Sequence, residues 1–285
     1  MLHPTDHVGL VACSNPLQTS RRAEIDALCD KLKTLGLVPV VSDCIFAENG
    51  GFRTDPTARA AALMRCYADH RIRAIFDLSG GDLANEILPR LDWEQIRANP
   101  KPFFGYSDLT VLVNAIFAMT GQPAHLFQIR TLVGSSGAEQ RRRFAASVLG
   151  EGEDLYSADW HFIQGTRMEG TLVGGNLRCL LKLAGTRYLP NFSDRLLFLE
   201  ALHGTPPQVV TYLSQLEQMG VFDQIAGLLL GTFTQLEEQL SPAGAARLIA
   251  DVIGRRDLPI AKTQQVGHGD ASRCLVIGQL YRIAR

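Results

Sequence analysis

The chain has 285 residues, of which 46% are hydrophobic, so it can bury a substantial core in one large domain or two smaller ones. Its 28 Lys and Arg residues balance 29 Asp and Glu residues, and no basic stripe stands out. This charge pattern argues against nucleic acid and anionic membrane surfaces as partners. No run of about eighteen apolar residues is present, so we expect no helix to cross a membrane.

The six cysteines are scattered along the chain, without a C-x-x-C pair and without histidines at zinc-finger spacing. We therefore expect no metal site, no disulfide framework and no cofactor, and the composition fits a reducing cytoplasm. The segment "GLVAC" (9–13) slightly resembles a lipoprotein cleavage box, but its apolar run is too short for a signal sequence. We interpret it as a buried strand.

In the first half of the chain, apolar runs typical of strands alternate with amphipathic runs typical of helices. This alternation predicts a parallel sheet covered by helices. Gly36 is placed to end the first helix, and Asp55-Pro56 form a cap and a first-turn proline for the second. The predicted strands cover 7–13, 37–43, 72–79 and 101–106, and the predicted helices cover 21–35, 60–68 and 109–119.

The segment 134–165 is polar and charged, and we interpret it as a connection between two lobes. The sequence thus predicts an α/β protein with an N-terminal, Rossmann-like parallel-sheet lobe (1–133). A smaller, strand-rich mixed α/β lobe (166–285) follows the connection. Its predicted strands cover 170–175, 195–200, 226–233, 258–264 and 274–283, and its predicted helices lie near 176–185, 207–219 and 242–254.

Ser107 lies in "FFGYSDLT" (103–110), between a predicted strand and a predicted helix. A serine on such a turn projects above the sheet, close to the free amides at the positive end of the helix. We expect Gly105 to permit the turn and the amide of Asp108 to stabilise an oxyanion. The alternative is that Ser107 only caps the helix, because serine is a preferred N-cap residue.

Two further residues could activate this serine. Glu200 ends the apolar run "RLLFLE", where a carboxylate could orient an imidazole, although it could also be a solvated acid. His268 lies between two glycines in "QVGHGD", in a predicted loop after a strand. Such loops often carry functional side chains, and the glycines would allow a sharp turn. His125 and His203 remain competing candidates for the base.

Five segments together resemble the LD-carboxypeptidase family of serine peptidases, which includes the microcin C immunity peptidases. They are "SGGDLANEILPRLDW" (79–93), "GYSDLT" (105–110), "GTLVGGNLRCL" (170–180), "LLFLE" (196–200) and "VGHGD" (266–270), and the match runs over almost the whole chain. The resemblance implies two lobes with the active site at their junction. It makes Ser107 the nucleophile, His268 the general base and Glu200 the group that orients it, with an oxyanion hole formed by the amides of Gly81 and Asp108.

The family implies cleavage of an L–D amide bond, which releases the terminal D-alanine of a murein tetrapeptide during cell-wall recycling in the cytoplasm. It also implies a homodimer whose partner is a small peptide substrate. The alternatives are a microcin-immunity-type peptidase that hydrolyses a peptidyl- or aminoacyl-nucleotide amide, and a non-catalytic ligand-binding homologue. Trp93, Trp160 and Phe127 are candidate partners for an adenine ring.

The chain departs from the family pattern in three places that affect the substrate more than the chemistry. Asp82-Leu83 replaces an aromatic-glycine pair, and this puts an acid beside the expected oxyanion hole. "AHLFQ" (124–128) stands where the family commonly has a histidine-glycine-proline segment. Ala201 replaces an acid that often follows the triad glutamate, and the loop after it is unusual.

Overall fold

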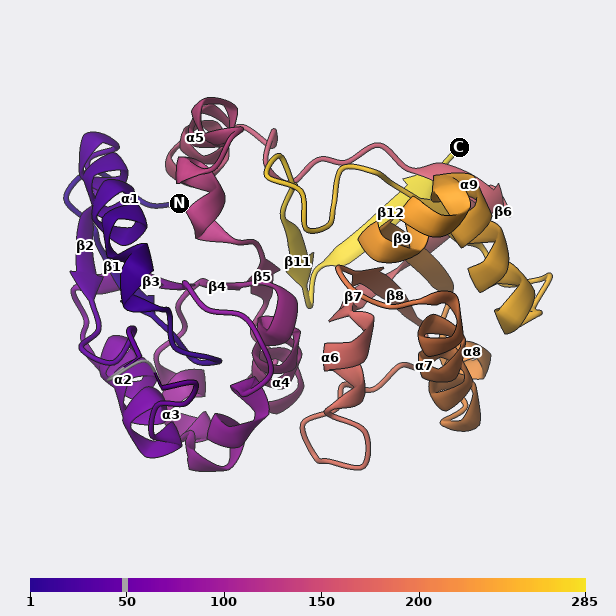
Figure 1. Ribbon diagram of the computed structural model, residues 1–285, viewed down its shortest axis with the longest axis horizontal. Coiled ribbons are helices and arrows are strands. Elements are labelled where there is room, and N and C mark those ends of the chain that lie inside the picture. Colours follow the sequence, from indigo (N-terminus) through magenta and orange to yellow (C-terminus); the bar gives the residue numbers. More distant parts are fainter. Residues whose placement is uncertain (48–50) are drawn as a thin grey trace.

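Two six-stranded sheets lie side by side in the structure, a computed structural model that describes residues 1–47 and 51–285 (Figure 1). The protein is an α/β protein whose N-terminal sheet is mostly parallel and whose C-terminal sheet is mixed, in agreement with the predicted fold class. No helix in the described part of the chain is long and apolar enough to span a bilayer.

The N-terminal sheet has the strand order β11-β5-β4-β3-β1-β2, and all neighbouring strands are parallel except β11 and β5. The buried strand β1 confirms the interpretation of "GLVAC" as core. The strands are β1 (His7–Val11), β2 (Val38–Val41), β3 (Ile72–Asp77), β4 (Phe103–Gly105), β5 (Ala124–Leu126) and β11 (Leu275–Ile277). The helices α1 (Arg22–Thr34), α2 (Pro56–Ala68), α3 (Trp93–Ala98) and α4 (Thr110–Thr120) connect them. As predicted, Asp55 caps α2, although the helix begins at Pro56 and not near residue 60.

The C-terminal sheet has the order β12-β7-β8-β9-β10-β6, with parallel pairs in its centre and an antiparallel strand at each edge. Its strands are β6 (His161–Gln164), β7 (Arg167–Asn176), β8 (Arg195–Ala201), β9 (Gly227–Phe233), β10 (Ile260–Lys262) and β12 (Leu280–Ala284). The helices are α6 (Leu177–Leu181), α7 (Pro206–Gln218), α8 (Val221–Gln224) and α9 (Thr234–Ile253). Helix α9 is kinked at Ser241, just before Pro242.

The single strand predicted at 274–283 is wrong. Gly278, with φ +88°, ends β11 and starts a turn into β12, and the two strands belong to different sheets. The predicted connection also holds more structure than expected, since β6 and helix α5 (Gly137–Phe144) both lie in it. Phe144 packs in the core of the N-terminal lobe. The domain boundaries at 133 and 165 stay predictions, and we propose that α5 and β11 be assigned to the N-terminal lobe.

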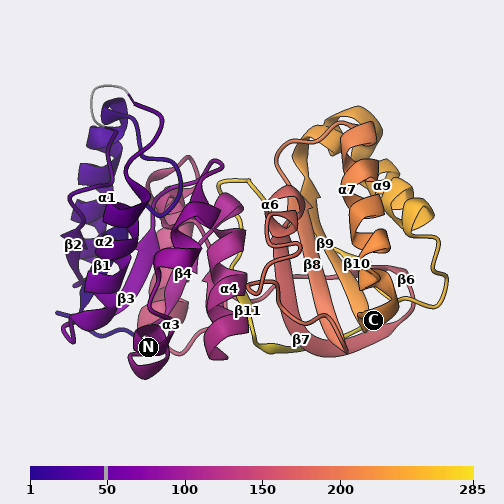
Figure 2. The same cartoon turned by 90° about the horizontal axis from the view of Figure 1, so that it is seen from below.

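Helix α4 lies between the two sheets, where it contacts both β7 and α6 (Figure 2). One buried apolar cluster includes Leu112 and Ile116 of α4 together with Val173 and Leu177 of the C-terminal lobe. Because close-packed interiors are stiff, this shared core fixes how the two lobes face each other. The start of α4, where Ser107 lies, is therefore held against the C-terminal sheet.

Candidate active site

Ser107 lies at the strand-to-helix turn that the sequence predicts. Strand β4 ends at Gly105, and Ser107 begins a 3-10 turn, Ser107–Leu109, that leads into α4. Its φ is +58°, which is rare for a residue other than glycine and costs about 1–3 kcal/mol. Such strain is common where a side chain must be presented in a fixed direction. The half-buried serine lines a cavity of about 370 Å³.

Gly105 contributes differently from our expectation. The left-handed residue of the turn is Ser107 itself, and Gly105 is not among the residues with positive φ. A Cβ at Gly105 would instead lie 2.6 Å from the Cβ of Leu109, so glycine is needed for the helix to start this close to β4. The Ser107 side chain does not act as an N-cap, because no capping hydrogen bond is present in this turn or at the start of α4.

Glu200 and His268 form a close pair in the C-terminal lobe. Oε2 of Glu200 is 2.7 Å from Nδ1 of His268, and Oε1 accepts a hydrogen bond of 3.0 Å from Nδ2 of Asn176. The Glu200 side chain is only 1% exposed, so the alternative of a solvated acid at a strand end is wrong. Nε2 of His268 has no hydrogen-bond partner among the described residues, which leaves that nitrogen available.

The loop that carries His268 depends on its first glycine. A Cβ at Gly267 would lie 1.7 Å from Oγ1 and 2.8 Å from Cβ of Thr232, so no other residue fits there unless Thr232 or the loop shifts. The ring of Tyr106 packs edge-on against the imidazole, with 5.1 Å between the ring centroids. Burial, reinforced by the nearby Glu200 charge, raises the pKa of Tyr106 well above its usual value. The tyrosine is therefore neutral at physiological pH.

Ser107 and His268 line the same cavity, one from each lobe, without a hydrogen bond between them. The cavity wall also includes Ser79 and Gly80, which directly precede Gly81. The amides of Gly81 and Asp108 find no acceptor among the described residues. Both N–H groups are thus without an internal acceptor in this part of the chain, although neither residue is among those that line the cavity.

Hydrogen bonds between the two lobes fix the position of helix α4 relative to β7. The amide of Asn176 donates to Oγ1 of Thr110 at 2.8 Å, and the side chain of Asn114 bonds both the N–H and the C=O of Gly174. A Cβ at Gly175 would lie 2.5 Å from Oγ1 of Thr110. The glycine-glycine-asparagine segment therefore allows the contact that aligns the serine with the opposite lobe.

Our reading of the sequence missed Asn176 as a site residue. Its side chain caps α6 through the amide of Cys179 and also holds Glu200. The available signal was an asparagine between a strand and a helix, in a segment already singled out for its two glycines. An N-cap asparagine alone gives no indication of a contact with Glu200, which is 24 residues away.

The acid at Asp82 is compensated by the C-terminal lobe. Its carboxylate pairs with the Arg178 guanidinium, and Nζ of Lys182 lies 3.5 Å away. The hydrogen bond from Arg178 lowers the pKa of Asp82. Lys182 also pairs with the fully buried carboxylate of Asp108, which accepts a 2.6 Å hydrogen bond from Ser14. These contacts anchor the loop beside the candidate oxyanion hole.

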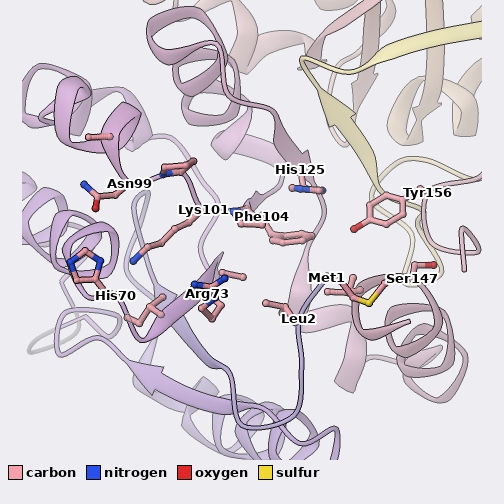
Figure 3. A pocket seen from close by; sticks show the side chains of 16 residues that line it. Met1, Leu2, His70, Arg73, Asn99, Lys101, Phe104, His125, Ser147 and Tyr156 are labelled. Atoms are coloured by element: carbon pink, nitrogen blue, oxygen red, sulfur yellow. The ribbon is translucent and has the colours of Figure 1, made fainter. Parts of the chain in front are cut away.

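Neither competing histidine lines the cavity beside Ser107. His203 is exposed, and His125 stacks on Phe104 with 4.1 Å between the ring centroids. Burial lowers the pKa of His125 to about 4, so its ring is neutral. His125 lines a different cavity of about 640 Å³, which lies near the amino ends of β3 and β4 and also includes Lys101 (Figure 3). Within residues 1–47 and 51–285, no three His, Cys, Asp or Glu side chains are grouped to hold a metal.

Two family models match the chain and cover most of it. Residues 8–126 match the LD-carboxypeptidase N-terminal domain, and residues 169–283 match the LD-carboxypeptidase C-terminal domain. The chain belongs to the LD-carboxypeptidase family. It is therefore a member of a family of serine peptidases, as the motifs predict.

The chain is similar both to murein tetrapeptide carboxypeptidases and to MccF-like proteins. It is 30% identical to the murein tetrapeptide carboxypeptidase of Pseudomonas aeruginosa over 221 residues, which are 73% of this chain and 71% of that protein. An MccF-like protein from Bacillus anthracis superposes with a TM-score of 0.88 at 24% identity, covering 100% of this chain and 95% of that one. The muramoyltetrapeptide carboxypeptidase of Oxalobacter formigenes superposes with a TM-score of 0.79 at 21% identity, covering 98% of this chain and 95% of that one. At these identities the two structures show a shared fold.

Proposed function

We propose that the protein is a serine carboxypeptidase that cleaves an L–D amide bond and releases the terminal D-alanine of a murein tetrapeptide. The observation that carries this proposal is the 2.7 Å pair of Glu200 and His268 at a cavity that Ser107 enters from the other lobe. The relative from P. aeruginosa, which is named for this substrate, supports it. The proposal includes a role in cytoplasmic cell-wall recycling and a homodimeric state.

In the proposed mechanism, Oγ of Ser107 attacks the amide carbonyl while Nε2 of His268 accepts its proton. The hydrogen bond from Nδ1–H to Glu200 would fix the tautomer that leaves Nε2 basic, and the buried carboxylate would stabilise the imidazolium. The amides of Gly81 and Asp108 would stabilise the oxyanion. His268 then protonates the leaving amine, and a water molecule releases the acyl group from Ser107 by the same route.

The rival nucleotide-amide substrate finds less support in this cavity. Trp93 and Phe127 are buried in the core, and Trp160 packs against Phe198. None of the three lines the cavity beside Ser107, where Tyr106 and His268 are the only aromatic rings among the described residues. An adenine ring would find no broad stacking surface of the kind that such ligands use. We therefore favour a peptide substrate.

The direct test incubates murein tetrapeptide with four proteins and measures D-alanine release by mass spectrometry. The proteins are the wild type, Ser107→Ala, His268→Ala and the control His203→Ala, which changes an exposed histidine outside the cavity. We expect release by the wild type and the control, and none by the other two. An intact peptide after incubation with the wild type would refute the substrate. Release by Ser107→Ala would refute the mechanism.

A further inference from the structure

The cavity beside Ser107 contains a guanidinium group that the proposed mechanism does not use. Arg130 lies in the 3-10 turn Ile129–Val133, just after β5, and lines this cavity. Strands β4 and β5 are parallel, so Arg130 and Ser107 follow neighbouring strands at the same edge of the sheet. The carboxyl edge of a parallel sheet is where ligands usually bind.

The positive charge of Arg130 is only partly compensated. Its Nη1 donates to Oε1 of Glu24 at 3.2 Å, and Oε2 of the same carboxylate accepts from Arg21 at 3.0 Å. Two guanidinium groups thus share one carboxylate. Asp270 also lines the cavity, but its Oδ2 accepts hydrogen bonds from both the amide and the hydroxyl of Ser135, and no ion pair joins it to either arginine in the described part of the chain.

The Arg130 side chain is also poorly solvated. It is only 20% exposed, and its Nε has no hydrogen-bond partner among the described residues. Burial lowers the pKa of Arg130, but a guanidinium still carries its charge at neutral pH. A partly desolvated charge that shares its one carboxylate with a second guanidinium is stabilised when a ligand supplies a further acceptor to its Nη groups. A carboxylate is the natural partner, because it accepts two parallel hydrogen bonds from the guanidinium fork.

We infer that Arg130, assisted by Arg21, forms a subsite that binds a carboxylate of the substrate. The inference rests on the proposed function, and it names a group that would select the substrate. We place this carboxylate on one of the two residues that flank the scissile amide bond, which are the terminal D-alanine and a diaminopimelate third residue with its side-chain carboxylate. In either case, peptides without the matching carboxylate would bind poorly, so the subsite would select substrates that carry it.

The test compares kcat/KM for three substrates. They are the diaminopimelate tetrapeptide ending in D-alanine, the same peptide ending in D-alaninamide, and the tetrapeptide with lysine as its third residue. The proteins are wild type, Arg130→Gln, Arg130→Lys and the control Arg71→Gln, which changes an exposed arginine outside this cavity. Thermal unfolding checks that each variant folds, and Arg130→Lys carries the test alone if Arg130→Gln does not fold.

We expect Arg130→Gln to lower kcat/KM about tenfold or more, chiefly through KM, for peptides that carry the recognised carboxylate. It should have little effect on the one peptide that lacks this carboxylate. That peptide identifies the source: the amide for a terminal carboxylate, the lysine peptide for a side-chain carboxylate. Arg130→Lys should give an intermediate loss, because it keeps the charge and loses the fork. An equal loss for all three peptides, or no loss, would overturn the inference.

Calorimetry in the Ser107→Ala background separates this inference from the proposed function. If the wild type cleaves none of the peptides, the proposed function fails, and binding still reports on the subsite. Ser107→Ala should then bind the carboxylate peptides more tightly than Ser107→Ala with Arg130→Gln, with no such difference for the peptide that lacks the carboxylate. Equal affinities, or no binding by either protein, would contradict the subsite.

Discussion

The two lobes contribute to the candidate site by different physical means. The N-terminal lobe presents Ser107 through its backbone, with a left-handed φ of +58° between β4 and α4 and no side-chain capping hydrogen bond in this turn or at the start of the helix. The C-terminal lobe presents His268 through side chains, in the chain of hydrogen bonds from Asn176 to Glu200 to His268. The backbone around Ser107 should therefore keep its conformation when the serine side chain is removed. The orientation of the His268 ring, in contrast, depends on the side chains of Glu200 and Asn176.

The contact between α4 and β7 sets the position of Ser107 relative to His268. Thr110 and Asn114 of α4 bond directly to the segment Gly174–Asn176, whose last residue also holds Glu200. A single short segment of β7 thus links the helix that follows the serine with the carboxylate that orients the histidine. We therefore expect substitutions to reduce activity most at the Glu200–His268 pair, less at this contact between the lobes, and least at the solvent-exposed Asp82–Arg178 pair.

The largest effect is expected for Glu200→Gln, which tests the side-chain arrangement of the C-terminal lobe. The neutral amide would no longer stabilise an imidazolium, and it could offer its N–H₂ to Nδ1 and so favour the wrong tautomer. We expect kcat to fall by about 10⁴ with little change in KM. Steady-state kinetics against Glu238→Gln, an exposed glutamate on α9, provide the comparison. Matching rates for the two variants would rule out the proposed role of Glu200.

An intermediate effect is expected for Gly175→Ala, which tests the contact between the lobes. The new Cβ would lie 2.5 Å from Oγ1 of Thr110 and should push α4 away from β7. A misplacement of about 1 Å between reacting groups can cost about 100-fold in rate. Gly204→Ala is the control for backbone strain, because its φ of +143° matches the +140° of Gly175 and its Cβ would meet only a Val209 methyl group, at 3.0 Å. If both variants lose the same activity, backbone strain and not alignment is the cause.

The smallest effect is expected for Arg178→Gln, which tests the exposed rim. The Arg178 and Asp82 side chains are 44% and 58% exposed, and exposed ion pairs contribute at most about 1 kcal/mol. We expect a correspondingly small change in the free energy of unfolding, measured by denaturant titration, and a kcat within about twofold of the wild type. A much larger loss of activity would mean that Asp82 takes part in the reaction.

The sequence was most informative where local pattern and local structure agree. Alternating apolar runs predicted β1 to β4 of the N-terminal lobe but not the short parallel strand β5, and Asp55-Pro56 predicted the cap of α2. It failed where the outcome depends on distant partners. The apolar run 274–283 looks like one strand, but its first part pairs with β5 in one sheet and its second part with β7 in the other.

The same limit applies to the candidate site. Ser107, Glu200 and His268 could be proposed from strand ends, glycines and a family resemblance. Asn176 and Arg130 could not be proposed in this way. The relevant contacts, of Asn176 with Glu200 and of Arg130 with Glu24, join residues more than 20 positions apart. The local sequence of Arg130, "FQIRT", contains nothing that indicates a pairing with Glu24, which is 106 residues distant. Such roles emerge only when the chain is folded.

Joint activation of Ser107 by the two lobes can be tested by covalent labelling of the serine. The protein would be treated with a fluorophosphonate, and the labelled peptide identified by mass spectrometry. We expect one adduct, on Ser107, which forms rapidly in the wild type, slowly in His268→Ala and Glu200→Gln, and not at all in Ser107→Ala. An adduct on another residue, or equal labelling rates in the wild type and His268→Ala, would contradict it.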